Sequence, residues 1–297
     1  SSDVCSSDLR KKSLIVSIFI IVSLMTFGCS NSASPSDTSS GYTKSDSKDN
    51  SSNDNQNDSK DSKSQENNST NNNQSKEATN TTTVNKKNEQ YIICIDPGHQ
   101  TKGDMSEEPV APGSSEKKFK VSWGTQGVAT KIPEYELTLS ASKILKKDLE
   151  QMGFKVIMTR ETNDVNITNS ERAIFANDNN ADLVIRIHAD GSDDSSTTGA
   201  SLHIPSQDSQ YTSKIYPESN ECAKLISLQM KQDGFKVNNI YQRSDLTGFN
   251  WSKVPVVLVE MGFMSNPEED QKMAETSYQE KMMKSVAEGA QAYFENK

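Results

Sequence analysis

Apolar and polar positions divide the chain into three segments of different character. Residues 10–29 combine a basic start with an apolar run, and residues 30–88 contain hardly any apolar side chains. Residues 89–297 instead alternate between short apolar runs and longer amphipathic stretches. Only this last segment has the pattern of a packed domain, and a length of roughly 200 residues suits a single hydrophobic core. We therefore expect the chemistry of the protein to reside in residues 89–297.

The spacing of apolar residues within this domain predicts alternating strands and helices. Short apolar runs bounded by turn residues are typical of strands, and apolar residues at positions i, i+3 and i+4 are typical of helices. Asn169 is expected to cap the second helix. Strands separated by helices at this spacing predict an α/β fold with a largely parallel or mixed sheet between helix layers. The expected strands are residues 91–96, 154–160, 183–188, 200–204, 239–242 and 254–260, and the expected helices are residues 134–152, 169–176, 217–232 and 277–294.

The longest interruption of this alternation is residues 100–133, where prolines and glycines separate scattered aromatic residues. Loops of this length inside a compact domain are usually functional or disordered. The segment joins the end of the first expected strand to the start of the first expected helix. We therefore predict that it forms a wall of the active site.

The amino-terminal apolar run has the length of a secretion signal. The basic residues Arg10–Lys12 precede the uncharged run Leu14–Phe27, which is 14 residues long. A membrane-spanning helix needs about 20 apolar residues, so the run fits a signal peptide better. Gly28 followed by Cys29 is similar to a bacterial lipoprotein processing site, at which the cysteine is acylated. We predict a signal peptide with a lipobox at residues 10–29; a plain cleaved signal and an uncleaved anchor are the alternatives, and all three export the protein.

The composition of residues 1–9 and 30–88 indicates that neither segment forms part of a folded domain. Residues 30–88 are almost entirely Ser, Asn, Asp, Thr, Lys and Gln, with Tyr42 as their single aromatic residue. Such a segment cannot bury enough surface to offset its ordering entropy, so we predict a disordered tether. Residues 1–9 precede the basic start and fit no targeting pattern, so we interpret them as an assembly or cloning artefact.

Charge and cysteine content narrow the function further. The formal net charge of −9 argues against nucleic acid as a partner, because phosphate binding needs a basic face. Cys94 lies in an expected strand and Cys222 in an expected helix. We interpret both as buried small apolar residues rather than as parts of a disulfide framework.

Histidine and glutamate stand at the ends of several expected elements. His99 follows the first strand, and Glu260 ends the apolar run VPVVLVE. His188 ends the expected strand within the run LVIRIHAD, of which only the last two residues follow it. Glu134 begins the first long helix. Side chains at the carboxyl ends of parallel strands project into the crevice where α/β proteins place their chemistry. A carboxylate at the end of so apolar a strand costs free energy unless it is paired, metal-bound or catalytic.

Simpler interpretations of these residues stay open at this point. A histidine at a strand end is often a hydrogen-bonded structural residue, and Glu134 in a first helical turn can simply complement the helix dipole. Chemistry alone also allows Glu136 or Glu260 to exchange roles with Glu134. The chain has no short metal motif of the His-Glu-x-x-His type. The pattern therefore indicates a His₂Glu hydrolase site without fixing its members.

Four strings, taken in order, resemble the zinc-dependent N-acetylmuramoyl-L-alanine amidases, which are cell-wall amidases of bacteria and spores. They cover the domain from residue 91 to residue 296, and four ordered motifs are more specific than any one of them. The strings are IDPGHQ at residues 95–100, EYELTL at 134–139, ERAIFANDNNADLVIRIHAD at 171–190 and VPVVLVEMGFMSNPEE at 254–269.

The resemblance implies one zinc ion per domain, held by His99, Glu134 and His188, with Glu260 as the catalytic glutamate. It implies a three-layer αβα fold with a twisted sheet of about six strands. The implied reaction is hydrolysis of the amide bond between N-acetylmuramic acid and L-alanine in peptidoglycan, as in an autolysin. We expect a monomer that acts outside the cytoplasm, anchored to the membrane through lipidated Cys29 or secreted into the cell wall. The alternatives are a zinc peptidase acting within the stem peptide and a non-catalytic wall-binding lipoprotein.

Three positions differ from the family pattern. Gln100 stands where glycine usually follows the motif histidine, Arg186 stands where serine is common, and Asp190 stands where asparagine is common. Because these residues lie beside the implied ligands, we expect them to affect substrate recognition rather than metal binding.

Several other residues receive expected roles. Arg172 is expected to pair with a backbone or acidic group rather than to touch substrate, and His203 is not expected to be a ligand. A polar and aromatic cluster before the last strand is a candidate lining for a glycan or peptide groove. Its members are Arg243, Asp245, Asn250 and Trp251.

Overall fold

The computed structural model describes residues 87–297. The predictions of an artefact at residues 1–9, of a signal peptide and lipid site at residues 10–29 and of most of the tether at residues 30–88 fall outside the described residues. Within residues 87–297, no helix combines the length and the apolar content that a membrane crossing requires.

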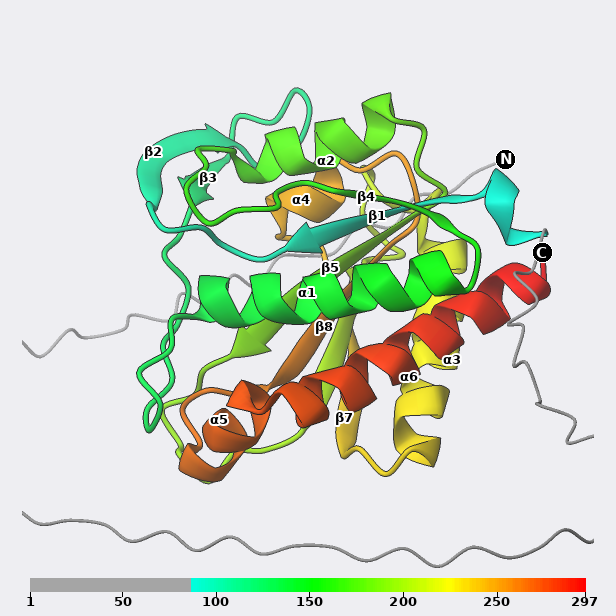
Figure 1. The fold of residues 1–297 in the computed structure, drawn as a ribbon. Coiled ribbons are helices and arrows are strands. Elements are labelled where there is room, and N and C mark those ends of the chain that lie inside the picture. Colours follow the sequence, from blue (N-terminus) through cyan, green and yellow to red (C-terminus); the bar gives the residue numbers. More distant parts are fainter. Residues whose placement is uncertain (1–86) are drawn as a thin grey trace, which may run out of the picture. The chain divides into compact units, whose positions relative to one another are not determined.

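One sheet of six strands runs through the domain, and two further strands form a separate hairpin (Figure 1). All strands and helices expected from the apolar pattern are present, with ends that differ by a few residues. The elements in chain order are η1 (Asn88–Gln90), β1 (Ile92–Pro97), β2 (Asp104–Pro109), β3 (Lys117–Val121), α1 (Glu134–Gln151), β4 (Lys155–Met158), α2 (Asn169–Asp178), β5 (Leu183–Asp190), β6 (Ala200–Pro205), α3 (Tyr216–Gln232), β7 (Val237–Arg243), α4 (Thr247–Asn250), β8 (Val256–Phe263), α5 (Pro267–Ala274) and α6 (Thr276–Glu295).

The strand order of the sheet brings three parallel strands together at its centre. The order is β4-β1-β5-β8-β6-β7, and every neighbouring pair is parallel except β6 with β8. This arrangement confirms the predicted mostly parallel, mixed sheet of about six strands. Because β1, β5 and β8 are adjacent and parallel, their carboxyl ends meet at one edge of the sheet. The register places His188 of β5 directly opposite Glu260 of β8.

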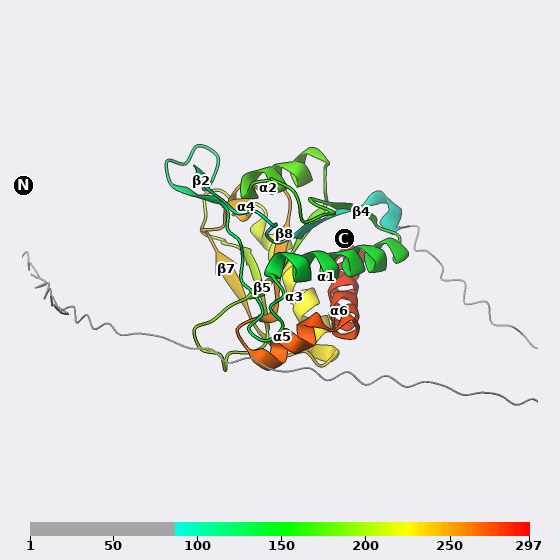
Figure 2. The same cartoon turned by 60° about the vertical axis from the view of Figure 1, so that its left-hand side comes forward.

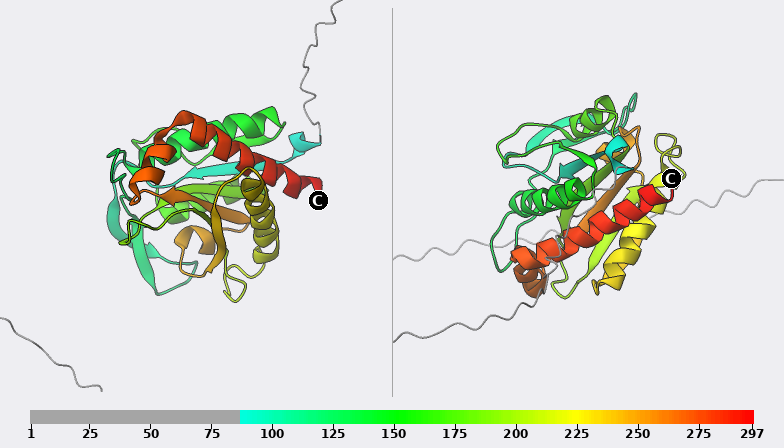
Figure 3. Two further views of the ribbon diagram at one scale, coloured as in Figure 1. Left: turned by 90° about the horizontal axis from the view of Figure 1, so that it is seen from below. Right: turned by 45° about the vertical axis from the view of Figure 1, so that its right-hand side comes forward.

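Helices cover the two faces of the sheet unequally. The long helices α1, α6 and α3 lie on one face, with α6 in contact with both others (Figure 3), and the shorter α2 and α4 lie on the opposite face (Figure 2). Leu183, Ile185 and Ile187 of β5 are fully buried in the large core beneath the long helices. Because side chains alternate along a strand, Arg186 and His188 project to the α2 and α4 face. That thinly covered face is where the site forms.

Residues 100–133 contain regular structure that the apolar pattern did not reveal. β2 and β3 pair as an antiparallel hairpin, and most of their residues are polar or charged. The prediction that the segment forms a wall of the site is confirmed for its later part, because Ser122 to Thr125 line the cavity described below. The short helices α4 and α5 were not predicted either.

The start of α2 differs from the prediction by one residue. Thr168, not Asn169, is the N-cap, and its side chain accepts a hydrogen bond from the backbone N–H of Glu171. The carboxylate of Glu171 in turn accepts a bond from the backbone N–H of Thr168 at 2.8 Å. Glu171 stands three residues after Thr168, so only Thr168 can form this reciprocal capping box. The prediction for Cys94 and Cys222 is confirmed, since both are buried free thiols.

Candidate metal centre

Three side chains that are far apart in the sequence meet at the carboxyl ends of the central strands. Glu134 Oε1 lies 3.1 Å from His99 Nε2 and 3.1 Å from His188 Nδ1. One donor atom from each of the three residues lies within 4.8 Å of the other two. Across the described residues, this is the single group of histidine, cysteine and carboxylate side chains with the spacing of a metal site. We refer to these three residues as the triad.

The backbone at His99 adopts an unusual conformation that its neighbours hold in place. Its φ angle is 59°, and the left-handed region costs a non-glycine residue about 1–2 kcal/mol. Arg172 of α2 donates hydrogen bonds to the carbonyls of His99 at 3.0 Å and Pro97 at 2.8 Å. His99 Nδ1 lies 2.9 Å from the carbonyl oxygen of Ser122. Because a carbonyl can only accept, Nδ1 carries a hydrogen, and Nε2 is the ring nitrogen that faces Glu134.

Glu134 is the first residue of α1 and is buried at the edge of the sheet. Its carboxylate accepts backbone hydrogen bonds from Thr125 at 2.9 Å and Ala189 at 3.2 Å. Burial raises the pKa of this carboxyl group, but hydrogen bonds from His188 and His99 outweigh burial and hold the pKa below its usual range. Glu134 is therefore an anion at neutral pH, as a metal ligand must be.

His188 is neutral at physiological pH and fits into space that glycine residues provide. Burial lowers the pKa of His188 to about 4, so its ring keeps a lone pair for a metal. A Cβ atom at Gly98 would lie 2.4 Å from His188 Cε1, and one at Gly124 would lie 2.7 Å from Glu134 Oε2. Larger residues at either glycine would displace the triad. His188 Nε2 is buried and has no hydrogen-bond partner within residues 87–297.

A fourth titratable group faces the same space. Glu260 lies opposite His188 in the sheet, and its Oε2 atom is buried without a hydrogen-bond partner in the described part of the chain. Burial raises the pKa of Glu260 well above its ordinary value, and the charges of Glu134 and Asp190 raise it further. A cavity of about 460 Å³ contains both the triad and Glu260. A carboxyl group with a raised pKa beside a candidate metal site is suited to accept and return a proton.

The residues present fit a zinc ion. Ligand atoms about 2.0–2.1 Å from a tetrahedral zinc lie roughly 3.3 Å apart, close to the 3.1 Å between Glu134 Oε1 and each histidine nitrogen. Two neutral histidines and one carboxylate form a donor set of catalytic zinc sites, which keep one position open for water or substrate. The unpartnered buried oxygen of Glu260 is what a site built around a ligand is expected to contain.

The structure separates the other histidine and glutamate candidates from the triad. Glu136 is exposed on α1, so it cannot exchange roles with Glu134. His203 of β6 contacts Ser201 and Arg243 and, as predicted, does not belong to the cluster of possible ligands.

The polar and aromatic residues before β8 do not act as one unit. Arg243 lines a surface cavity of about 310 Å³ and forms an ion pair of 2.8 Å with Asp245. Asn250 is buried in α4 and donates to a carbonyl of its own loop. Trp251 Nε1 donates to the carbonyl of Pro109 at 2.9 Å and so connects the loop to β2. The structure thus gives Asn250 and Trp251 contacts that fix the loop.

Gln100 does not face the cavity, contrary to the expectation that it affects substrate recognition. It is fully buried, and its Oε1 atom accepts a hydrogen bond from Arg172 at 2.9 Å. Arg172 itself pairs with Asp96 at 2.8 Å, as predicted for an acidic or backbone partner. Sequence reasoning missed Ser122 and Thr125, because they bind the triad through backbone groups that every residue type carries.

Comparisons with known proteins show the family of this chain. The sequence model of a family described as N-acetylmuramoyl-L-alanine amidase matches residues 93–292. The chain is 26% identical over 210 residues to the N-acetylmuramoyl-L-alanine amidase Rv3717 of Mycobacterium tuberculosis, a match covering 68% of this chain and 86% of that protein. It is 26% identical over 202 residues to the N-acetylmuramoyl-L-alanine amidase LytC of Bacillus subtilis, of which the match spans only 35%.

Solved structures show the same fold. The apo form of the N-acetylmuramyl-L-alanine amidase Ami1 from Mycobacterium abscessus superposes with a TM-score of 0.62 at 27% identity, covering 68% of this chain and 98% of that one. Ami1 from Mycobacterium smegmatis superposes with a TM-score of 0.63 at 24% identity, covering 70% and 98%. These likenesses agree with the predicted three-layer α/β architecture.

Proposed function

Because the chain belongs to the N-acetylmuramoyl-L-alanine amidase family, we propose that it cleaves peptidoglycan with a zinc ion held by His99, Glu134 and His188. The bond is the amide between the lactyl group of N-acetylmuramic acid and L-alanine. One observation carries this proposal: the triad and Glu260 share a single cavity at the carboxyl ends of adjacent strands. A zinc amidase needs both a metal position and a proton carrier there.

The residues divide the work between metal binding and proton transfer. When bound, zinc would lower the pKa of a water molecule and polarise the scissile carbonyl. Glu260 takes a proton from the attacking water and delivers it to the leaving nitrogen of L-alanine. Its raised pKa suits this role, because a stronger acid would not hold the proton between the two events. Ser122 and Thr125 keep His99 and Glu134 in place through backbone hydrogen bonds.

We also propose that this reaction takes place outside the cytoplasm. The basic and apolar pattern of residues 10–29 supports export, and a cell-wall substrate is reached from that side. In this scheme residues 89–297 are the catalytic domain, residues 30–88 are a tether, and lipidated Cys29 anchors the protein unless the signal is simply cleaved. Mass spectrometry of Cys29 in the exported protein distinguishes the two forms.

The test combines metal content with product analysis. A chelator should abolish the release of stem peptides from purified peptidoglycan, and zinc should restore it. His188→Ala should lose zinc, whereas Glu260→Gln should keep zinc and lose activity by a factor of about 10²–10⁴. Glu136→Gln, on the exposed side of the same helix as Glu134, is the control and should match the wild type.

The outcome also separates the alternatives. Intact stem peptides identify an amidase, and truncated stem peptides identify a peptidase acting within the stem. Tight binding to the wall without any product, in zinc-loaded protein, would indicate a binding protein. Release that persists in the presence of the chelator, or equal zinc content in His188→Ala and the wild type, would contradict the proposed metal site.

A further inference from the structure

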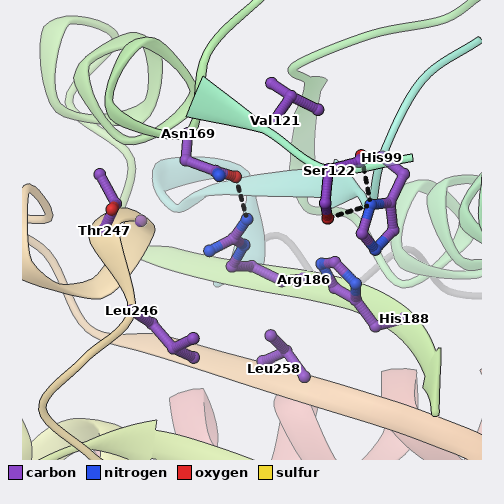
Figure 4. Close-up of a pocket in the computed structure, with 10 residues that line it drawn as sticks. His99, Val121, Ser122, Asn169, Arg186, His188, Leu246, Thr247 and Leu258 are labelled. Carbon is purple, nitrogen blue, oxygen red and sulfur yellow. Dashed lines mark hydrogen bonds between the residues drawn. The ribbon is translucent and has the colours of Figure 1, made fainter. Parts of the chain in front are cut away.

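A second cavity adjoins the triad on the side of α2 and α4 (Figure 4). It encloses about 160 Å³ and shares His99 and His188 with the cavity that contains Glu260. Asn169 of α2 and Arg186 of β5 contribute its polar lining. A group bound here would therefore lie next to the reaction centre but would not contact the proton carrier.

Arg186 is a buried cation with donors that the protein does not use. The residue is 6% exposed, and its Nε atom donates to Asp96 at 2.8 Å. Its Nη2 atom reaches Asn169 Oδ1 only at 3.4 Å, as Figure 4 shows. Nη1 has no hydrogen-bond acceptor among the described residues. Because Nη1 is not fully buried and Arg186 lines the cavity, this group can donate to an acceptor bound there that the protein itself does not supply.

The charge around Arg186 is also unbalanced. Asp96 is 2.8 Å from Arg186 and 2.8 Å from Arg172, so one buried carboxylate serves two buried guanidinium groups. Arg160, a third buried arginine, donates to backbone carbonyls. The carboxylate of Glu108 is occupied by the first turn of α2. Arg186 therefore shares its one ion-pair partner with Arg172, and an anion in the cavity would give its guanidinium group a second partner.

The guanidinium group and the walls of the cavity favour a planar anion with a short apolar neighbour. A guanidinium group binds a carboxylate through parallel N–H bonds in a way that an ammonium group cannot. Gly248 of α4 lines the cavity, and a Cβ atom there would lie 2.0 Å from Arg186 Nη1. The glycine thus permits the guanidinium to occupy this position. Leu246 and Leu258 add apolar walls that suit a methyl group or a short aliphatic chain.

We propose that this cavity is a carboxylate subsite, in which Arg186 selects stem peptides with a free α-carboxylate on the residue that follows L-alanine. In stem peptides that residue is a glutamate joined through its side chain, so its α-carboxyl group is either a free carboxylate or an amide. The proposal rests on the amidase function proposed above, because it assigns the peptide side of the same substrate. The larger cavity, of about 460 Å³ and lined by exposed Trp123, is left for the sugar side.

The spacing of the two groups agrees with this assignment. Arg186 and His188 are two residues apart on the same face of β5, so their Cα atoms are about 6.6 Å apart at roughly 3.3 Å per residue. From a scissile carbonyl at the triad, L-alanine and the start of the next residue extend by a similar length, since an extended residue spans about 3.3–3.6 Å. The α-carboxylate of the second residue therefore reaches Arg186, while the methyl group of L-alanine lies near the leucine walls.

The test compares two substrates that differ only at this carboxyl group. Zinc-loaded full-length protein is given N-acetylmuramoyl-L-alanyl-D-isoglutamate and its α-amide, N-acetylmuramoyl-L-alanyl-D-isoglutamine, and kcat/KM is measured for each. Wild type should prefer the acid by about tenfold or more, as expected for a hydrogen-bonded charge pair. Arg186→Gln should lower the ratio of kcat/KM for the acid to kcat/KM for the amide to about one. Arg186→Lys should restore only part of the preference.

Two controls separate recognition from folding and from general charge effects. In Arg186→Gln, Asp96 still has Arg172 as a partner, and a lost fold would reduce both substrates equally rather than changing their ratio. Lys253→Gln removes one positive charge from an exposed position before β8 and should keep the wild-type ratio. A wild-type ratio near one, or an unchanged ratio in Arg186→Gln whose circular dichroism spectrum matches that of the wild type, would overturn the subsite.

A binding experiment distinguishes failure of the proposed amidase function from failure of the subsite. If wild type cleaves neither compound, binding of the free peptides L-alanyl-D-isoglutamate and L-alanyl-D-isoglutamine is measured by calorimetry. The subsite would be supported, although the proposed reaction had failed, if the acid binds about tenfold more tightly than the amide. This difference in affinity should disappear in Arg186→Gln. Equal or undetectable binding of both peptides would overturn the subsite as well.

Discussion

Replacing Arg172 by methionine should weaken both the fold and metal binding, because its side chain holds a buried carboxylate and the backbone of the proposed metal ligand His99. Arg172 is 3% exposed. It donates to Asp96 at 2.8 Å, Pro97 at 2.8 Å, His99 at 3.0 Å and Gln100 at 2.9 Å. Methionine fills similar space but donates no hydrogen bond, so these four acceptors all lose a partner.

The contacts of Asp96 set the size of the effect. Breaking a buried ion pair typically costs about 3–5 kcal/mol. Asp96 keeps Arg186 and Thr159 as partners, which places its loss near the lower bound, and the orphaned carbonyls add about 1 kcal/mol or more. We expect a loss of about 4 kcal/mol in the free energy of unfolding. For a domain of roughly 200 residues, this lowers the melting temperature by about 8–16 °C.

Urea unfolding followed by circular dichroism measures the loss, and competition with a chromophoric chelator measures zinc affinity. Zinc affinity should fall by about 10–100-fold, as for other residues that orient a ligand. Lys146→Met is the control, because it removes a partly exposed ion pair with Glu161 worth at most about 1 kcal/mol. A loss below about 1 kcal/mol in Arg172→Met, together with unchanged zinc affinity, would refute the reasoning.

Three further outcomes follow from the site. Burial raises the pKa of Asp96, but Arg172 and Arg186 lower it below its ordinary value of 3.8. The contribution of Asp96 to stability is therefore full above that pH and is lost below it. Urea titrations at decreasing pH should show this loss in the wild type and should not show it in Asp96→Asn. Gly98→Ala should weaken zinc binding in a chelator competition, because its Cβ atom would lie 2.4 Å from His188 Cε1; unchanged affinity would contradict the packing argument. Glu260→Gln should raise the free energy of unfolding of the metal-free protein at neutral pH. The pKa of Glu260 is raised in the folded protein, so ionisation of this group destabilises the fold at any pH above its ordinary pKa of 4.5. A lower free energy of unfolding for the variant, measured in urea, would contradict this argument.

The sequence by itself determined the fold class and the candidate metal ligands. Alternating apolar runs determine which elements form and which face of each is buried, so the α/β alternation could be read directly. His99, Glu134 and His188 stood at element ends, but only the resemblance of ordered motifs to a family selected them over simpler interpretations. The hairpin of β2 and β3 was not predicted, because its mostly polar residues show no apolar periodicity.

Tertiary structure alone decided how the residues around the ligands are used. Gln100 and Arg186 both depart from the family pattern, yet Gln100 is turned inward onto Arg172 while Arg186 lines a cavity. Nothing in their local sequence distinguishes these outcomes, because each depends on which distant element packs against the side chain. The backbone bonds from Ser122 and Thr125 are equally invisible in the sequence. Local pattern determines elements, whereas long-range packing determines which polar groups remain free to bind a ligand.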